Sequence, residues 1–233
     1  MDDLSSETLP GIRNFLDPDE RDHFNYLKLR TKDYHWEADD ITYNINSLGY
    51  RSCEFDTSTP CNIYLGCSHV LGEGLPLEDT FVYLVNKELN DFSLYNLGAR
   101  GASPEDCFRR MQTFLGLNIQ RVIFFVPYTG RRSFFIDKQW CTLSIAKDLP
   151  RMKKCRHLFK SLYSEEFENL MYDLTAYATE SICRENNIPY YVINQDSLKK
   201  GNTVNFIKDA RDLSHFGKST HKEIANKFLD IIK

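Results

Sequence analysis

The sequence predicts an α/β protein built on a doubly wound, parallel sheet. Four short apolar runs have the composition of buried parallel strands. Between and after them lie segments whose apolar residues recur at helical spacing. The expected strands are residues 63–65, 92–97, 121–127 and 189–193, and the expected helices are residues 79–89, 103–115, 164–184 and 220–232. Because strands and helices alternate along the chain, helices should cover both faces of the sheet.

The composition is that of an ordinary globular protein. With 233 residues, of which 42% are hydrophobic and 27% charged, the chain can bury a sizeable core. The formal net charge is −4, so no overall basic field exists to bind a phosphate backbone, and we expect no nucleic-acid partner. No apolar stretch approaches the roughly 20 residues of a membrane span, and the acidic N-terminus lacks the features of a signal peptide. We therefore expect a cytoplasmic protein.

The seven cysteines are odd in number and show no CxxC spacing. Neither a disulfide framework nor a zinc site is expected from such a pattern, and most of the thiols should be buried.

Residues 1–60 are expected to form an N-terminal covering segment, and residues 61–233 an α/β domain. In the covering segment, Asp17 and Pro18 predict the start of a helix, and the alternating residues 41–45 predict a strand. Within the domain, residues 128–163 show no clean period. A stretch of this length between sheet elements is more often a functional excursion than a plain connection.

Capping residues predict where two helices begin. Ser103 is followed by Pro104 and Asp106, which indicates an N-cap with a capping box. Thr220 and Glu223 suggest the same device at the start of the last helix. Residues 199–211 are expected to form a polar loop.

Ser68 follows the strand at residues 63–65 and lies in glycine-rich chain. The carboxyl ends of the strands are where ligands bind in an open α/β sheet, so Ser68 is placed like a functional hydroxyl. The alternative is a turn serine that bonds its own backbone. The adjacent His69 is expected to pack rather than to react, and Cys67 to be a buried thiol rather than a metal ligand.

An activating pair for Ser68 stands just before the last helix. Asp212 precedes His215 by three residues, so its carboxylate can accept from one imidazole nitrogen and leave the other free to take a proton from a hydroxyl. Asp209 is the competing carboxylate. The plain alternative for His215 is a loop histidine near a helix start.

Gly98 ends the second strand at the same edge of the sheet. Its backbone N–H could donate to the oxygen that becomes negative during acyl transfer, and the N–H of Ser68 would be a second donor. The alternative is a glycine needed only for the turn out of the strand.

These motifs resemble, in order and spacing, blocks I, II and V of the SGNH (GDSL-type) hydrolase family. The likeness rests on GCSHVLGEG at residues 66–74, NLGARG at residues 96–101 and DLSH at residues 212–215, and it extends over about residues 62–232.

The resemblance implies a three-layer α/β/α fold of the flavodoxin-like kind. It further implies that Ser68 is the nucleophile, His215 the base and Asp212 the residue that orients it, with Gly98 in the oxyanion hole. No metal or organic cofactor would be required.

The chain departs from the family pattern in two places. Cys67 stands where block I usually has an acid. The third block usually ends its strand with an Asn that donates to the oxyanion, and here no Asn follows residues 121–127. Loss of one such donor typically costs about 3 kcal/mol of transition-state stabilisation.

Four residues near the end of the third strand are candidates for substrate binding. Tyr128, Thr129 or Arg131 could replace the absent Asn as a donor. Arg131 or Arg132 could bind an acidic or sugar substrate, although such arginines are more often solvated charges.

The sequence thus predicts a serine esterase or acyl hydrolase that acts on an ester of a carbohydrate or another small molecule. One alternative is an O-acyltransferase that uses the same triad. The other is a binding or assembly protein that keeps the fold with little or no catalysis. The oligomeric state is left open.

Overall fold

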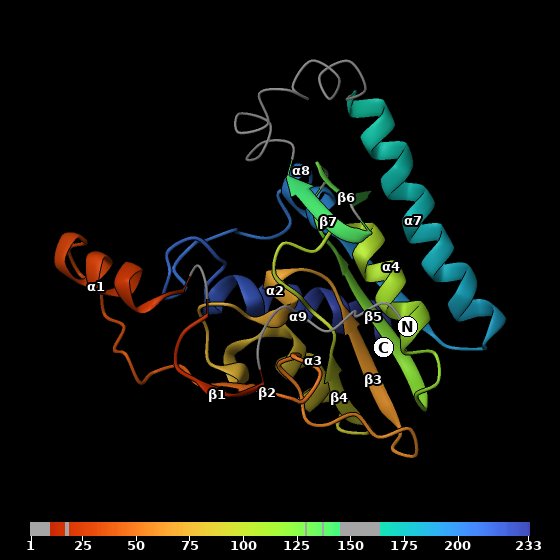
Figure 1. Ribbon diagram of the computed structural model, residues 1–233, viewed down its shortest axis with the longest axis horizontal. Coiled ribbons are helices and arrows are strands. Elements are labelled where there is room, and N and C mark those ends of the chain that lie inside the picture. The colour runs from red at the N-terminus through yellow and green to blue at the C-terminus, as the bar shows by residue number, and fades with distance from the viewer. Residues whose placement is uncertain (1–9, 17–18, 129, 137, 145–163) are drawn as a thin grey trace.

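A four-stranded parallel sheet forms the centre of the protein (Figure 1). The computed structural model describes residues 10–16, 19–128, 130–136, 138–144 and 164–233. The strands are β3 (Cys61–Leu65), β4 (Ser93–Asn96), β5 (Ile119–Val126) and β8 (Tyr190–Asn194), in the order β4-β3-β5-β8. All neighbouring pairs in this sheet are parallel, which confirms the predicted sheet.

Side chains of the central strands alternate between the two faces of the sheet. In β3, Ile63 and Leu65 pack on one face and Tyr64 on the other. In β5, Phe124 and Phe125 divide in the same way. Both strands are buried on both sides, which is why they appear in the sequence as continuous apolar runs.

Helices cover both faces, so the architecture is three-layer α/β/α, as predicted. Helices α4 (Pro104–Thr113) and α7 (Glu165–Glu185) pack together on one face, and α3 (Phe81–Leu89) and α9 (Lys218–Ile232) on the other (Figure 1). The predicted capping box at Ser103 is present at the start of α4. None of the helices in the described ranges is both long and apolar enough to cross a membrane.

The N-terminal residues lie against the carboxyl edge of the sheet. They form β1 (Gly11–Arg13), α1 (Arg21–Arg30) and β2 (Tyr43–Ile45), and β1 and β2 pair as a separate antiparallel sheet. The helix begins later than predicted, because Glu20 and not Asp17 precedes its first turn. Asp17 and Pro18 lie outside the described residues.

The predicted excursion contains a hairpin of β6 (Arg131–Ile136) and β7 (Gln139–Ser144). Asp106 of α4 holds this hairpin, since its carboxylate accepts from the hydroxyls of Ser133 and Thr142. The aromatic ring of Trp140 lies under the Arg109 guanidinium, 4.0 Å from ring centre to Cζ. Residues 145–163 lie outside the described residues.

Two expectations for the C-terminal part were wrong. Part of the expected polar loop is helix α8 (Gln195–Lys200). Helix α9 begins after Gly217, and Thr220 and Glu223 do not cap it. Instead, Thr220 Oγ1 accepts from the N–H of Ile207, and a Glu223 carboxylate oxygen accepts from the N–H of Asn205. These two side chains therefore accept from backbone N–H groups of the loop before α9.

Candidate active site

Ser68 lies at the carboxyl end of β3, the strand that has β4 on one side and β5 on the other. The chain leaves the strand through Gly66 and Cys67, and Ser68 is the first residue of the short helix α2 (Ser68–Leu71). This is the point where the strand order reverses, and such switch points leave a crevice for ligands. Ser68 is 4% exposed, so its hydroxyl lies just beneath the surface of that edge.

A tight turn in the loop before α9 brings Asp212 onto His215. Leu213, between them, has a left-handed φ of 51°, which is uncommon for a residue with a branched side chain. The Asp212 Oδ1 atom accepts from the N–H groups of Ser214 and His215, each at 3.1 Å. The backbone of the turn therefore holds the carboxylate through contacts separate from the one that it makes with the imidazole.

Ser68, His215 and Asp212 form one hydrogen-bonded chain. His215 Nδ1 lies 2.6 Å from Asp212 Oδ2, and His215 Nε2 lies 2.8 Å from Ser68 Oγ. Because an ionised carboxylate can only accept, the proton belongs on Nδ1, which leaves Nε2 to accept from the Ser68 hydroxyl. This arrangement can activate a hydroxyl as a nucleophile.

The surroundings keep Asp212 ionised. Burial alone would raise the pKa of Asp212, but the hydrogen bond and charge of His215 and the backbone N–H groups of Ser214 and His215 hold it below its usual value. The His215 side chain is 12% exposed, so its imidazole can be reached from solvent.

The competing carboxylate, Asp209, does not face the imidazole. Its oxygen occupies the space above Gly217, where a Cβ added to the glycine would lie only 1.3 Å away. Its backbone carbonyl accepts from the indole N–H of Trp36. Of the two candidate partners, Asp212 is the one that the fold places on His215.

His69 packs against aromatic rings. Its ring stacks on Phe216 with 3.8 Å between centroids, and meets the His215 ring edge-on at 5.3 Å. Burial and the nearby His215 lower the pKa of His69 well below its usual value, so its imidazole is neutral at physiological pH. Packing was the favoured expectation for this residue.

Glu73 is a site residue that the sequence reasoning missed. Its side chain is 1% exposed, and Oε2 lies 3.5 Å from His215 Nε2, on the side of the ring that faces Ser68. The available signal was a carboxylate between two glycines directly after the strand-end turn, in a stretch otherwise apolar enough to be buried.

Gly98 lies against the helix that begins with Ser68. A Cβ at this position would be 2.4 Å from the backbone nitrogen of Leu71 and 2.8 Å from the carbonyl carbon of Val70, so only glycine fits. Its N–H donates to the side-chain oxygen of Asn96 at 2.9 Å. An oxyanion at this position would have to compete with Asn96 for the N–H.

Arg131 lies beside the strand end that carries Ser68. Its guanidinium stacks on the Tyr128 ring, 4.6 Å from Cζ to the ring centre, and donates to the carbonyl of Ala102 at 3.5 Å. Burial alone would lower the pKa of Arg131, but the neighbouring Cys67 and Tyr128 raise it above its usual value. The arginine is therefore charged next to Cys67. Thr129 lies outside the described residues.

Arg132 has a structural role in the observed fold. It is 7% exposed, and its guanidinium pairs with Glu168 of α7 and Glu105 of α4. Two carboxylates already compensate its charge, and its guanidinium nitrogens donate to them and to backbone carbonyls of α7. These contacts do not favour the expectation that Arg132 binds substrate.

Two residues of the N-terminal segment, Asp19 and Tyr43, contact both the loop that carries His215 and the turn that follows Ser68. Arg211, next to Asp212, forms a buried ion pair with Asp19 at 2.7 Å. Asp19 also accepts from the hydroxyl of Tyr43, which in turn accepts from the N–H of Gly74. A single carboxylate near the start of the chain thus joins the loop of His215 to the turn that follows Ser68.

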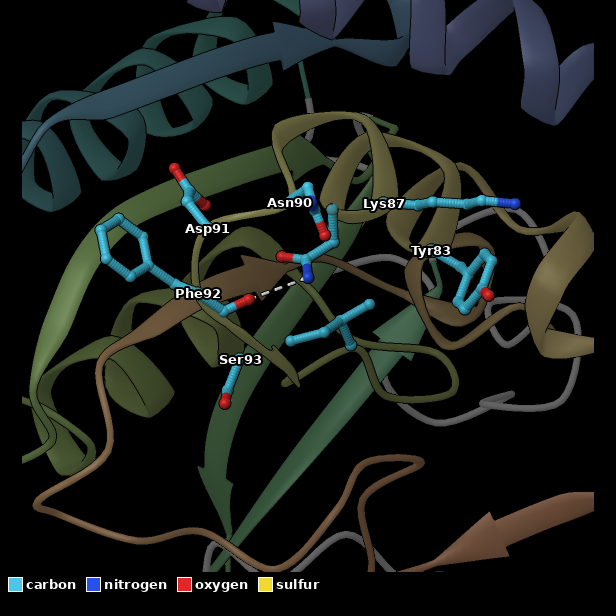
Figure 2. Close-up of a pocket in the computed structure, with 8 residues that line it drawn as sticks. Tyr83, Lys87, Asn90, Asp91, Phe92 and Ser93 are labelled. Atoms are coloured by element: carbon cyan, nitrogen blue, oxygen red, sulfur yellow. Dashed lines mark hydrogen bonds between the residues drawn. The ribbon is translucent and has the colours of Figure 1, made fainter.

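A hollow of about 490 Å³ lies elsewhere, where α3 leads into β4 (Figure 2). Tyr83 and Lys87 come from the helix, Asp91 and Phe92 from the connection, and Ser93 from the start of β4. Ser93 pairs with Cys61 at the amino ends of β4 and β3. The hollow is therefore at the opposite edge of the sheet from Ser68.

Among the described residues, no group of three or more His, Cys, Asp or Glu side chains is arranged to hold a metal ion.

Comparison with known proteins gives matches in structure and none in sequence. No family of proteins and no curated protein matches the sequence. Two matching structures are described as lipolytic proteins of the G-D-S-L family, the family that the motifs resemble. The one from Veillonella parvula is 14% identical, with 74% of this chain and 97% of that chain covered at a TM-score of 0.36. The one from Desulfitobacterium hafniense is 14% identical, with 76% and 100% covered at a TM-score of 0.39.

A third match is a gut microbial diltiazem-metabolizing enzyme. It is 13% identical, and the match covers 76% of this chain and 47% of that chain at a TM-score of 0.37. Likenesses this distant carry no information on activity.

Proposed function

We propose that the protein is a serine esterase or acyl hydrolase with Ser68 as nucleophile, His215 as base and Asp212 as the residue that orients the base. The observation that supports this proposal is the continuous contact from Ser68 Oγ through both nitrogens of His215 to Asp212 Oδ2, at 2.8 and 2.6 Å. Three side chains from two distant parts of the chain meet at the edge of the sheet where substrates bind in this class of fold.

The reaction proceeds in two halves. Ser68 Oγ bonds to the ester carbonyl carbon while its proton passes to His215 Nε2, and the resulting imidazolium gives that proton to the departing alkoxide. Water then attacks the acyl-serine, with His215 taking its proton and returning one to Ser68. Asp212 stays ionised throughout and stabilises the imidazolium.

The oxyanion is proposed to form near the start of α2. Ser68 is the first residue of that helix, where backbone N–H groups have no acceptor within the helix. The N–H of Ser68 is one donor. The Gly98 N–H becomes a second only if the bond to Asn96 gives way, and Tyr128 and Arg131 are the side chains proposed to compensate for the absent Asn.

The substrate is proposed to be an ester of a carbohydrate or another small molecule. Arg131 favours one with an anionic or multiply hydroxylated part, because its guanidinium stays charged and has a carbonyl and an aromatic ring, but no carboxylate, as neighbours in the described part of the chain. A carboxylate or phosphate on the substrate would complete its coordination.

The proposal is tested by labelling and turnover on the same samples. A fluorophosphonate probe should modify the wild-type protein at Ser68, and p-nitrophenyl acetate should be hydrolysed. In Ser68→Ala, labelling should vanish and turnover should fall by at least about a thousandfold, since the nucleophile is gone. Folding of the variant is checked by circular dichroism. Equal labelling and equal rates in the two proteins would rule out the nucleophile assignment.

An O-acyltransferase remains the alternative that shares this triad. It differs only in the acceptor that attacks the acyl-serine. Product analysis in the presence of candidate sugar acceptors separates the two, because transfer yields an acylated sugar where hydrolysis yields free acid.

A catalytically inert binding protein is the alternative favoured by one observation. The Gly98 N–H is already bonded to Asn96 at 2.9 Å, and no Asn follows β5. Folded wild-type protein that resists the fluorophosphonate probe would support this alternative.

A further inference from the structure

His215 lies between two carboxylates. Asp212 Oδ2 is 2.6 Å from Nδ1, and Glu73 Oε2 is 3.5 Å from Nε2. We propose that Glu73 is a second carboxylate partner of His215, which stabilises the imidazolium formed during catalysis. This inference rests on the proposed role of His215 as the base.

Two glycines bring Glu73 into this position. Gly72 and Gly74 have left-handed φ values of 75° and 78°, and neither has room for a side chain. A Cβ on Gly72 would be 2.3 Å from the Thr80 methyl group, and one on Gly74 would be 2.9 Å from Cβ of Ala210. The turn is thus pressed between α3 and the loop of His215, with Glu73 at its centre.

The backbone on either side of Glu73 is anchored by buried donors. The Arg51 guanidinium donates to the carbonyl of Gly72 at 2.7 Å and to that of Leu75 at 3.0 Å. The Gly74 carbonyl accepts from the N–H of Arg211 at 2.9 Å. The Glu73 backbone is therefore tied to the same loop that carries His215, so the distance between carboxylate and imidazole is fixed by the fold.

The contact between Glu73 and His215 strengthens only when the ring is charged. At rest, Nε2 carries no hydrogen, so Nε2 and a carboxylate oxygen are both acceptors and form no hydrogen bond. Once Nε2 has taken the Ser68 proton, it can donate, and the imidazolium lies next to a negative charge in a buried site. An interaction that is stronger in the transition state than in the resting enzyme lowers the barrier.

The other groups around His215 act in different directions. Asp212 also favours the charged ring. His69 is in ring contact with His215, and the buried His221 is close enough for the charge of His215 to lower its pKa. Both of these imidazoles are neutral, so neither stabilises a proton on His215. Arg131 opposes positive charge in this region, as its effect on His69 indicates. Glu73 and Asp212 are the two described carboxylates in contact with the imidazole.

Glu73→Gln keeps the shape of the side chain and removes its charge. An opposite charge at this distance raises a pKa by about one unit or more, so the acidic limb of the kcat/KM–pH profile should move about one unit to lower pH in the variant. The plateau rate should fall by up to about tenfold, because the base is weaker. In a separate NMR titration, the pKa of His215 should fall by the same amount, its resonance being assigned by its loss in His215→Gln.

Two further variants serve as controls. Glu78→Gln removes the same charge from η1 (Leu77–Asp79), just beyond the Glu73 turn, and should leave the acidic limb in place. Glu73→Asp keeps the charge. The acidic limb of its kcat/KM–pH profile should lie within a few tenths of a pH unit of the wild-type limb, even if the shorter side chain lowers the rate.

The two proposals fail in different ways. If wild-type protein shows no esterase activity and no fluorophosphonate labelling, the proposed function fails, whereas the NMR titration still tests the effect of Glu73 on His215. If the wild type is active and Glu73→Gln leaves both the limb and the His215 pKa unchanged, Glu73 has no electrostatic role and the inference is overturned.

Discussion

Asp212 binds three donors with its two oxygens. Oδ1 accepts from the backbone at Ser214 and His215, and Oδ2 accepts from the His215 ring. The backbone contacts hold the carboxylate in one orientation, so the ring contact decides which tautomer His215 adopts. At the scale of single residues, the site therefore depends on an acceptor-only group at position 212.

Asp212→Asn tests this dependence. An amide can keep the backbone contacts through its oxygen, but its NH2 group then faces Nδ1 and favours the tautomer with the proton on Nε2, which cannot accept from Ser68. We expect hydrolysis of p-nitrophenyl acetate to fall by about 10⁴-fold with little change in folding. The matched variant Asp209→Asn should stay within a few-fold of the wild-type rate. Similar losses in both variants would contradict the assignment of Asp212 as the orienting residue.

Helix α2 is the element on which the position of Ser68 depends. It has only four residues, so its own hydrogen bonds contribute little and its place is set by packing. Val70 contacts the core on one side of the sheet, and Gly98 lies against the backbone of Val70 and Leu71. The missing side chain at Gly98 thus lets α2 lie directly against the end of β4.

Gly98→Ala should displace this element. The added methyl group would lie 2.4 Å from the backbone nitrogen of Leu71, so α2 must move. We expect a loss of about 1–3 kcal/mol in the free energy of unfolding, measured with urea. Esterase activity should fall by about a hundredfold, because Ser68 moves relative to His215. Gly116→Ala, where nothing lies within 4 Å of the new atom, should leave both quantities nearly unchanged.

Acid stability is a property of the whole molecule, and buried histidines influence it. His221 of α9 is 1% exposed, and its Nδ1 accepts from the N–H of Phe81 at 3.0 Å. Burial, with smaller effects of the His215 and Arg51 charges, lowers the pKa of His221 to about 3. Between about pH 6.5 and about pH 3, His221 binds a proton in the unfolded chain but not in the folded protein. The free energy of unfolding therefore decreases as the pH falls through this range.

His221→Asn should reduce this pH dependence. The amide oxygen can still accept from Phe81, but the side chain no longer titrates. Between pH 7.5 and pH 5, the wild type should lose about 2 kcal/mol of unfolding free energy through His221 alone. Urea titrations at the two pH values should show a difference smaller by that amount in the variant. Identical differences in the two proteins would mean that His221 is protonated in the folded state.

The sheet and its helices could be predicted from the sequence because their signals are local. β5 lies between two helical layers, so every residue from Val122 to Val126 is apolar, and Ser103 with Asp106 caps α4 through backbone contacts three residues away. The strand-end position of Ser68 and the three-residue spacing of Asp212 and His215 also predicted that these side chains meet.

The remaining features depend on contacts between distant residues. Nothing near Thr220 indicates that its hydroxyl binds the loop at Ile207 instead of capping α9. Asp19 and Arg211 are 192 residues apart, and no pattern connects them. Glu73 resembles an ordinary surface acid until Gly72 and Gly74 turn it inward. In each case the partner is chosen by the tertiary fold.

The ion pair between Asp19 and Arg211 bears on how the protein matures during synthesis. Asp19 is synthesised 192 residues before Arg211, whereas the last strand of the parallel sheet is finished at Asn194. A nascent chain halted at that point contains all four strands of the sheet, yet it lacks His215, whose ring contacts Ser68. The contact between Ser68 and His215 can therefore form only after His215 has been synthesised, when Asp19 and Arg211 can also pair.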